Sequence, residues 1–144
     1  MDDGLIRSVQ QPVTDFIPEL APQGFAAVSL EDLLQMTSGI DYTENDFPLG
    51  EHVRLHYTDR LEDRLLQLTR EEPAGTRFEY RSSDALRLGL ILQRVLGETT
   101  ITQYTQARAW SPLGMEANGS WGTDYAPDGL EKTACRYAGA RPFP

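Results

Sequence analysis

Side chains of the types that carry chemistry are sparse in this chain of 144 residues, and the two histidines are the first to consider. His52 and His56 stand at i, i+4, so on a helix they would share one face, which is the spacing that zinc proteases use. Those sites place a glutamate directly after the first histidine and a third ligand further along the chain, whereas Val53 follows His52 here. We therefore predict no metal site and interpret both histidines as surface or packing residues.

The sequence gives equally little support for a catalytic cysteine or for a phosphate-binding loop. Cys135 is the only cysteine, which excludes an intrachain disulfide and a cysteine-rich metal site. It lies far in sequence from both histidines and has no nucleophile signature around it, so we expect a structural or surface cysteine. Gly114 and Gly119 lack the flanking pattern of a phosphate-binding loop, and we predict no cofactor.

The charge balance excludes several classes of partner. The chain has 22 acidic and 13 basic side chains and a net charge of -9, which opposes binding to a phosphate backbone. Trp110 and Trp121 therefore have no basic groove beside them, and we interpret them as core or loop anchors. No stretch is apolar enough to span a membrane, and the acidic start differs from a secretory signal. For the sequence as given, we expect no nucleic acid, no membrane and a cytoplasmic location.

The elements that must position any functional residue are mostly helices. Residues 29–35 have leucines at helical spacing, with Ser29 as the expected cap and Asp32 closing a capping box. Residues 59–70 repeat this pattern, with Asp59 as the expected cap. Each pattern predicts a short helix.

The strongest helix signal covers residues 83–96, and Gly97 is expected to end that helix. Thr100 and Gln103 open a further predicted helix that continues to about Trp110. Because the predicted helix over residues 83–96 is apolar around most of its circumference, we expect it to be buried. Its main stripe is predicted to consist of Ala85, Leu88, Leu92 and Val95, widened by Leu86, Leu90 and Ile91.

Strand signals are rare. Residues 76–80 alternate polar and apolar side chains, which fits either one short strand or an extended approach to the next helix. About residues 114–144 are rich in glycine, proline and aspartate and are expected to be loops. The prediction is a mainly α chain, a single domain over residues 1–144, with at most a short β element.

Five short phrases follow one another along the chain in a family-like order. Residues 13–20 read Val-Thr-Asp-Phe-Ile-Pro-Glu-Leu, and residues 33–39 read Leu-Leu-Gln-Met-Thr-Ser-Gly. Residues 73–80 read Pro-Ala-Gly-Thr-Arg-Phe-Glu-Tyr, residues 80–84 read Tyr-Arg-Ser-Ser-Asp, and residues 110–115 read Trp-Ser-Pro-Leu-Gly-Met. Together they resemble segments of the serine hydrolases related to class C β-lactamases and penicillin-binding proteins. The Tyr-x-Ser form at residues 80–82 is similar to the branch with 6-aminohexanoate-dimer hydrolase and related esterases.

The resemblance implies nucleophilic acyl transfer. In that family a serine of a Ser-x-x-Lys motif attacks a carbonyl, while the lysine and a tyrosine move protons and a Lys-Thr-Gly strand lines the site. The resemblance makes Tyr80 the proton-shuttling tyrosine, and it places Ser82 where many relatives carry an asparagine that orients substrate or the lysine. In this chain alone we interpret both as relic positions. A purely structural Tyr80, packed at the start of a helix, remains the alternative.

The rest of the catalytic set is absent from the sequence. Lys132 is the only lysine, and Gly129 stands three residues before it, so there is no Ser-x-x-Lys. The Lys-Thr-Ala at residues 132–134 resembles Lys-Thr-Gly only superficially. In family order the serine motif would lie upstream of Gly4, so we expect the chain to start after the nucleophile helix and to end before the Lys-Thr-Gly strand.

The leading interpretation is a truncated β-lactamase-like serine hydrolase that is inactive as an isolated chain. Relatives combine an α/β domain with an inserted, largely helical domain, and this sequence resembles the helical part. A non-catalytic binding or assembly module, or one half of a split hydrolase completed by another chain, are the alternatives. Because the stripe on residues 83–96 would lack part of its usual cover, we expect a homodimer or a complementing chain.

Overall fold

The computed structural model describes residues 3–44, 50–119, 122–124 and 129–133, and Trp121 and Cys135 lie outside these ranges. Over the described residues the chain is helical and has no strand, and its β-type pairing is limited to isolated bridges. The mainly α prediction is therefore confirmed. None of the described helices is long and apolar enough to cross a bilayer.

The N-terminal third consists of short helices. The 3-10 helices η1 (Val13–Asp15), η2 (Pro18–Gln23) and η3 (Phe25–Ala27) lead into α1 (Leu30–Leu34). The predicted capping box of α1 is present, since Ser29 Oγ accepts from the Asp32 amide and the Asp32 carboxylate accepts from the Ser29 amide at 2.8 Å. A local sequence signal was sufficient to locate this helix start.

Helices α2 (Glu51–Tyr57) and α3 (Leu61–Gln67) follow, and the expected cap of α3 is wrong. Asp59 does not cap the helix, which begins at Leu61 instead. The Leu61 amide donates to the carboxylate of Asp124 at 2.8 Å, a residue 63 positions away. A carboxylate from a distant segment therefore satisfies the amide that a local cap would have satisfied.

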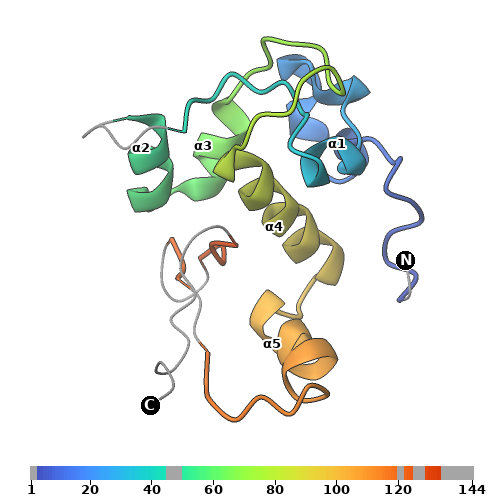
Figure 1. Ribbon diagram of the computed structural model, residues 1–144, viewed down its shortest axis with the longest axis vertical. Helices are drawn as coiled ribbons and strands as arrows, with labels where there is room; N and C mark the ends of the chain where they lie inside the picture. Colours follow the sequence, from blue (N-terminus) through green and yellow to red (C-terminus); the bar gives the residue numbers. More distant parts are fainter. Residues whose placement is uncertain (1–2, 45–49, 120–121, 125–128, 134–144) are drawn as a thin grey trace.

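Helix α4 (Ser82–Leu96) crosses the middle of the molecule and contacts α1, α3 and α5 (Figure 1). The helix is placed as predicted, but its core face differs from the expected one. The apolar residues that are almost fully buried are Leu86, Leu90 and Ile91. Leu88, Leu92 and Val95 are only partly buried, because α1 and α3 cover the other face of the helix.

The predicted helix after Gly97 is confirmed as α5 (Ile101–Thr105), which continues as one π-helical segment, η4 (Gln106–Trp110). Thr100 and Gln103 form the expected capping box. The start of α5 also receives a distant contact, because the Glu131 carboxylate accepts from the Thr102 amide at 3.1 Å.

Residues 76–80 form no strand and run as an extended approach to α4. Backbone carbonyls that follow α1 hold the segment before α4. Gly39 accepts from the amides of Glu71 and Glu72 at 3.0 and 3.2 Å, and Thr37 accepts from the Gly75 amide at 2.8 Å. Two phrases that stand far apart in the sequence, residues 33–39 and 73–80, thus lie side by side.

Gly39 is required at this junction, which yields a stability prediction. Its φ is +71°, and a Cβ built there would lie 2.2 Å from the Glu72 carbonyl oxygen. We expect Gly39→Ala to lower the free energy of unfolding by about 2–4 kcal/mol, combining left-handed strain with a backbone clash.

Gly114→Ala is the matched control, because Gly114 has a φ of +66° but nothing within 4 Å of an added Cβ. It should cost about 1 kcal/mol, the strain alone. Urea unfolding of the two variants measures the difference, and equal losses would show that the Gly39 contact with Glu72 contributes nothing.

Candidate functional site

Tyr80 lies on the extended segment directly before α4, and its side chain is 55% exposed. Its chain neighbours, Glu79 and Arg81, are bonded. The Glu79 amide donates to the Met36 carbonyl at 3.0 Å, and the buried Arg81 guanidinium donates to the Glu79 carboxylate at 2.8 Å. The structure therefore exposes a tyrosine side chain on a backbone that is anchored before it at Glu79 and after it at Ser82, whose amide donates to Glu44.

Ser82, the first residue of α4, has no exposed surface. Its Oγ lies 2.8 Å from the Tyr42 hydroxyl, and its amide donates to the Glu44 carboxylate at 2.8 Å. Tyr80 and Ser82 are two residues apart in the chain, but their side chains differ in environment. The tyrosine is exposed, whereas the serine hydroxyl contacts protein groups rather than solvent.

His52 completes this group, which we call the Ser82 cluster (Tyr42, Glu44, His52 and Ser82). His52 Nδ1 lies 2.6 Å from a Glu44 carboxylate oxygen and 3.3 Å from Ser82 Oγ. A nucleophilic triad would need the serine and the carboxylate on opposite nitrogens of the imidazole, whereas both lie at Nδ1 here. The cluster can hold Ser82 in place, but its geometry does not activate the hydroxyl.

Tyr42 and Glu44 were not identified from the sequence. Burial raises the pKa of the Tyr42 phenol, the hydrogen bond with Ser82 opposes that shift, and the Glu44 charge adds to it. Tyr42 is therefore protonated at neutral pH and serves as a hydrogen-bonding group. The only sequence feature that could have pointed to these two polar residues is their position shortly after the Thr-Ser-Gly phrase.

The two histidines share a face of α2 as the i, i+4 spacing predicts. Their ring centroids lie 4.3 Å apart, and His56 Nδ1 lies 3.2 Å from the His52 carbonyl oxygen. Within the ranges that the structure describes, no three histidine, cysteine, aspartate or glutamate side chains are placed to hold a metal ion.

A second buried polar group lies in the first turn of α4. Ser38 Oγ is 2.8 Å from both carboxylate oxygens of Asp84 and donates to that carboxylate. Burial raises the pKa of Asp84 to about 6, while the Ser38 hydrogen bond and the charges of Arg87 and Arg81 act in the opposite direction. The Thr-Ser-Gly phrase and the Tyr-Arg-Ser-Ser-Asp phrase therefore meet inside the molecule.

Arg87 is fully buried on the same helix, which the sequence pattern did not indicate. Its guanidinium donates to the Leu65 carbonyl at 2.7 Å and lies 4.5 Å from the ring centroid of Phe25. Burial lowers the pKa of Arg87 to about 10, so the side chain remains charged at neutral pH. It links α4 to the end of α3 and to η3.

Lys132, the only lysine, contacts the end of α2. Its Nζ donates to the carbonyls of His56 and Thr58 at 2.6 and 3.1 Å. The neighbouring Thr133 donates to the Ala85 carbonyl at 2.8 Å and lies against Gly89, where an added Cβ would come within 2.2 Å of its hydroxyl oxygen. Residues 132 and 133 thus fasten the C-terminal part of the described chain to α2 and α4.

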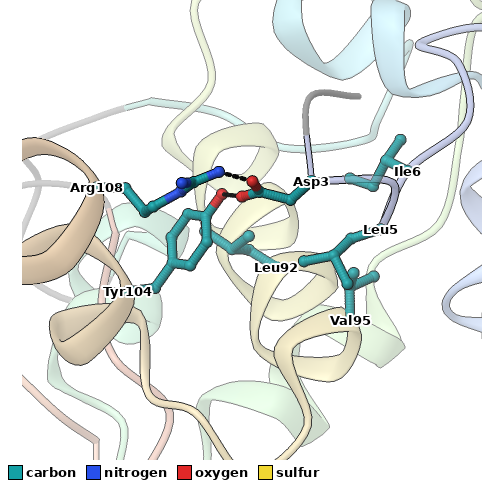
Figure 2. Close-up of a pocket in the computed structure, with 7 residues that line it drawn as sticks. All are labelled: Asp3, Leu5, Ile6, Leu92, Val95, Tyr104 and Arg108. Atoms are coloured by element: carbon teal, nitrogen blue, oxygen red, sulfur yellow. Dashed lines mark hydrogen bonds and ion pairs between the residues drawn. The ribbon is translucent and has the colours of Figure 1, made fainter.

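A cavity of about 630 Å³ lies between the N-terminal segment, α4 and α5 (Figure 2). One side of the cavity is apolar. The other side is polar, because Asp3 accepts a hydrogen bond from the Tyr104 hydroxyl at 2.5 Å and forms an ion pair with Arg108. The apolar residues that line it are Leu5, Ile6, Leu92 and Val95. This cavity borders the C-terminal half of α4, whereas Tyr80 precedes its N-terminus.

Comparison with known proteins identifies the family of this chain and solved structures that share its fold. The family model described as Beta-lactamase matches residues 2–140. The chain superposes on a Bacillus anthracis protein assigned as a 6-aminohexanoate-dimer hydrolase with a TM-score of 0.72 at 20% identity, covering 92% of this chain and 39% of that one. For a penicillin-binding protein from Bacillus halodurans the TM-score is 0.63 at 25% identity, with 85% and 38% covered.

A third solved structure is EstCE1, a hydrolase with promiscuous acyltransferase activity. Its TM-score is 0.62 at 25% identity, and the match covers 85% of this chain and 35% of that one. No curated protein matches the sequence. The chain therefore spans between 35% and 39% of the length of these three structures.

The buried Asp84 carboxyl predicts a pH dependence with a definite sign. Burial raises its pKa from an ordinary 3.8 to about 6, so between these values the folded chain retains a proton that the unfolded chain has released. The stability due to this group should therefore fall by about 3 kcal/mol as the pH rises from about 4 to about 6, and stay level above that.

Asp84→Asn removes the titration and keeps an oxygen that can accept from Ser38. Urea unfolding of both proteins from about pH 4 to about pH 7 should show the unchanged chain losing stability relative to the variant across that window. Two parallel stability curves would contradict the raised pKa of Asp84.

Proposed function

Because the chain belongs to the β-lactamase family, we propose that it is the tyrosine-bearing helical part of a serine acyl-transfer hydrolase. In this proposal the nucleophilic serine and its lysine come from residues outside this sequence. The chain contributes Tyr80 as the proton-transferring phenol, next to the anchored start of α4.

The placement of Tyr80 is the observation that carries the proposal. A general acid or base must be accessible to the reacting group and held in a fixed position. Tyr80 is 55% exposed, whereas Arg81 and Ser82 on its C-terminal side are buried and bonded. An aromatic residue with a purely structural role would be expected to bury more of its ring at such a junction.

The substrate class follows from the chemistry of such a site and is an activated ester or amide. EstCE1, which shares this fold, is a hydrolase with promiscuous acyltransferase activity, and this supports acyl chemistry for the whole protein. Within this chain the single lysine amine is engaged with α2 carbonyls, and no serine stands three residues before it. We therefore expect the isolated chain to be inactive.

A homodimer is the second proposal, and one exposed surface favours it. Leu5 is 45% exposed and lines the cavity beside Leu92 and Val95, which are only partly buried. Pairing two such surfaces across a two-fold axis would remove apolar area from water. This arrangement would suit a non-catalytic assembly module as well as a split hydrolase.

The first test is acyl-transfer activity. The isolated chain should hydrolyse p-nitrophenyl acetate no faster than buffer and form no adduct with a serine-directed acylating agent. Mixed with a chain that carries Ser-x-x-Lys and Lys-Thr-Gly segments, it should support hydrolysis, which Tyr80→Phe lowers by about 10²- to 10⁴-fold. Tyr57→Phe is the matched control, because Tyr57 is 72% exposed and lies outside the motif.

Two results would contradict the activity proposal. One is a stoichiometric acyl adduct on a single serine of the isolated chain, detected by mass spectrometry. The other is an active mixture whose rate is the same with Tyr80→Phe as with the unchanged chain.

The second test is association. We expect sedimentation equilibrium at micromolar concentration to report a dimer, and Leu5→Glu to give a monomer because it places a charge on the apolar surface. Leu113→Glu is the control, since Leu113 is 69% exposed and does not line this cavity. A monomer for the unchanged chain, with no binding of a dye for exposed apolar surface, would refute the dimer.

A further inference from the structure

We propose that Glu44 and His52 are positioning residues for Tyr80, acting through the first turn of α4. Glu44 binds the backbone of Ser82, and His52 fixes the carboxylate of Glu44. The role of Tyr80 in proton transfer rests on the function proposed above, whereas the positioning itself is a property of this chain and can be measured without catalysis.

Helix α4 needs a partner at its N-terminus because it has no cap of its own. Arg81 occupies the N-cap position and makes no side-chain capping bond. Its carbonyl accepts from the Asp84 amide at 3.1 Å, but the Ser82 amide, the first of the helix, needs an acceptor from elsewhere. A Glu44 carboxylate oxygen accepts from the Ser82 amide at 2.8 Å. A carboxylate at this end of a 15-residue helix is also favoured by the helix dipole.

The second oxygen of Glu44 has a separate partner. It lies 2.6 Å from His52 Nδ1, and the side chains of Glu44 and His52 are 26% and 21% exposed. Because the nitrogen faces a carboxylate, it donates, so the Nδ1–H tautomer or the imidazolium is present. With one oxygen on the helix and the other on α2, the carboxylate has little freedom to rotate.

Tyr42 closes the group from the other side of Ser82. Its hydroxyl is 2.8 Å from Ser82 Oγ, and the residue is 3% exposed. Ser82 is therefore held twice, at its amide by Glu44 and at its hydroxyl by Tyr42. Since two peptide units separate Tyr80 from Ser82, fixing Ser82 restricts where the phenol can lie.

The segment that supplies Glu44 also holds the other side of Tyr80. Met36 has a φ of +57° and, in this left-handed conformation, its carbonyl accepts from the Glu79 amide at 3.0 Å. Residues 36–44 thus bind the chain one residue before Tyr80 and two residues after it. Loss of the Glu44 contact should loosen only the later of these two attachments.

Amide hydrogen exchange and ring resonances of the ¹⁵N,¹³C-labelled chain test the proposal. Glu44→Gln replaces the charged acceptor, so exchange at the Ser82 amide should accelerate about 10- to 100-fold, and the Tyr80 ring signals should move toward random-coil positions. Tyr80→Phe assigns those ring signals. Glu51→Gln is the matched control, because the Glu51 side chain, 43% exposed on α2 next to His52, pairs with Arg54 and not with α4.

Substitutions at His52 test the second link. His52→Leu should reproduce the Glu44→Gln effect on Ser82 and Tyr80, because the carboxylate loses its donor. His52→Asn should restore most of the protection, since the Asn Nδ2 group can donate from about the position of Nδ1. This rescue separates positioning from the mere filling of space.

The amides of Leu90 and Ile91, in the middle of α4, distinguish local loosening from global unfolding. The proposal requires that their exchange stay unchanged while Ser82 and Tyr80 respond. It is overturned if Ser82 and Tyr80 do not respond to Glu44→Gln, if all α4 amides accelerate equally, or if His52→Asn fails to rescue. None of these outcomes depends on acyl transfer, so the activity assay and this experiment can fail independently.

Discussion

The burial of a polar helix turn is the constraint on which the rest of this structure depends. The first turn of α4 contains serines, an aspartate and, one turn later, an arginine, all with essentially no exposed surface. Buried polar groups are costly unless they are hydrogen-bonded, and several of these groups find partners elsewhere in the chain, although Ser83 Oγ has none among the described residues. Ser38 supplies one for Asp84, and the Leu65 carbonyl supplies one for Arg87. These requirements bring α1, α2 and α3 together around one end of α4.

The same constraint relates the fold to the candidate site. Three of the five phrases that carry the family resemblance, residues 33–39, 73–80 and 80–84, meet at or beside this turn. Ser38 of the first phrase is bonded to Asp84, and the carbonyl of Thr37 accepts from the amide of Gly75 in the second. Tyr80 lies next to backbone that is bonded on both sides, yet its side chain remains accessible. A rigid support under an exposed functional group is the arrangement that acid-base catalysis requires.

Sequence reasoning succeeded where the signal was local and failed where it was distant. The capping boxes at Ser29 and Thr100 use residues three positions apart, and both were predicted. The acceptors at α3 and α4 come from Asp124 and Glu44, 63 and 38 residues away from their donors, and no local pattern indicates them. The buried Arg87 was missed for a related reason, because its partners are a backbone carbonyl and an aromatic ring on other elements.

The contact between Asp3 and Tyr104 has a consequence for the order in which the chain assembles. It joins residues 101 positions apart, whereas the pairs at the start of α4 span 38 to 46 positions. Closing a longer loop costs more chain entropy, and during synthesis Asp3 must wait until α5 and η4 have emerged. Docking of the N-terminal segment should therefore be a late step, after a nucleus formed by α1, α3 and α4 has already condensed.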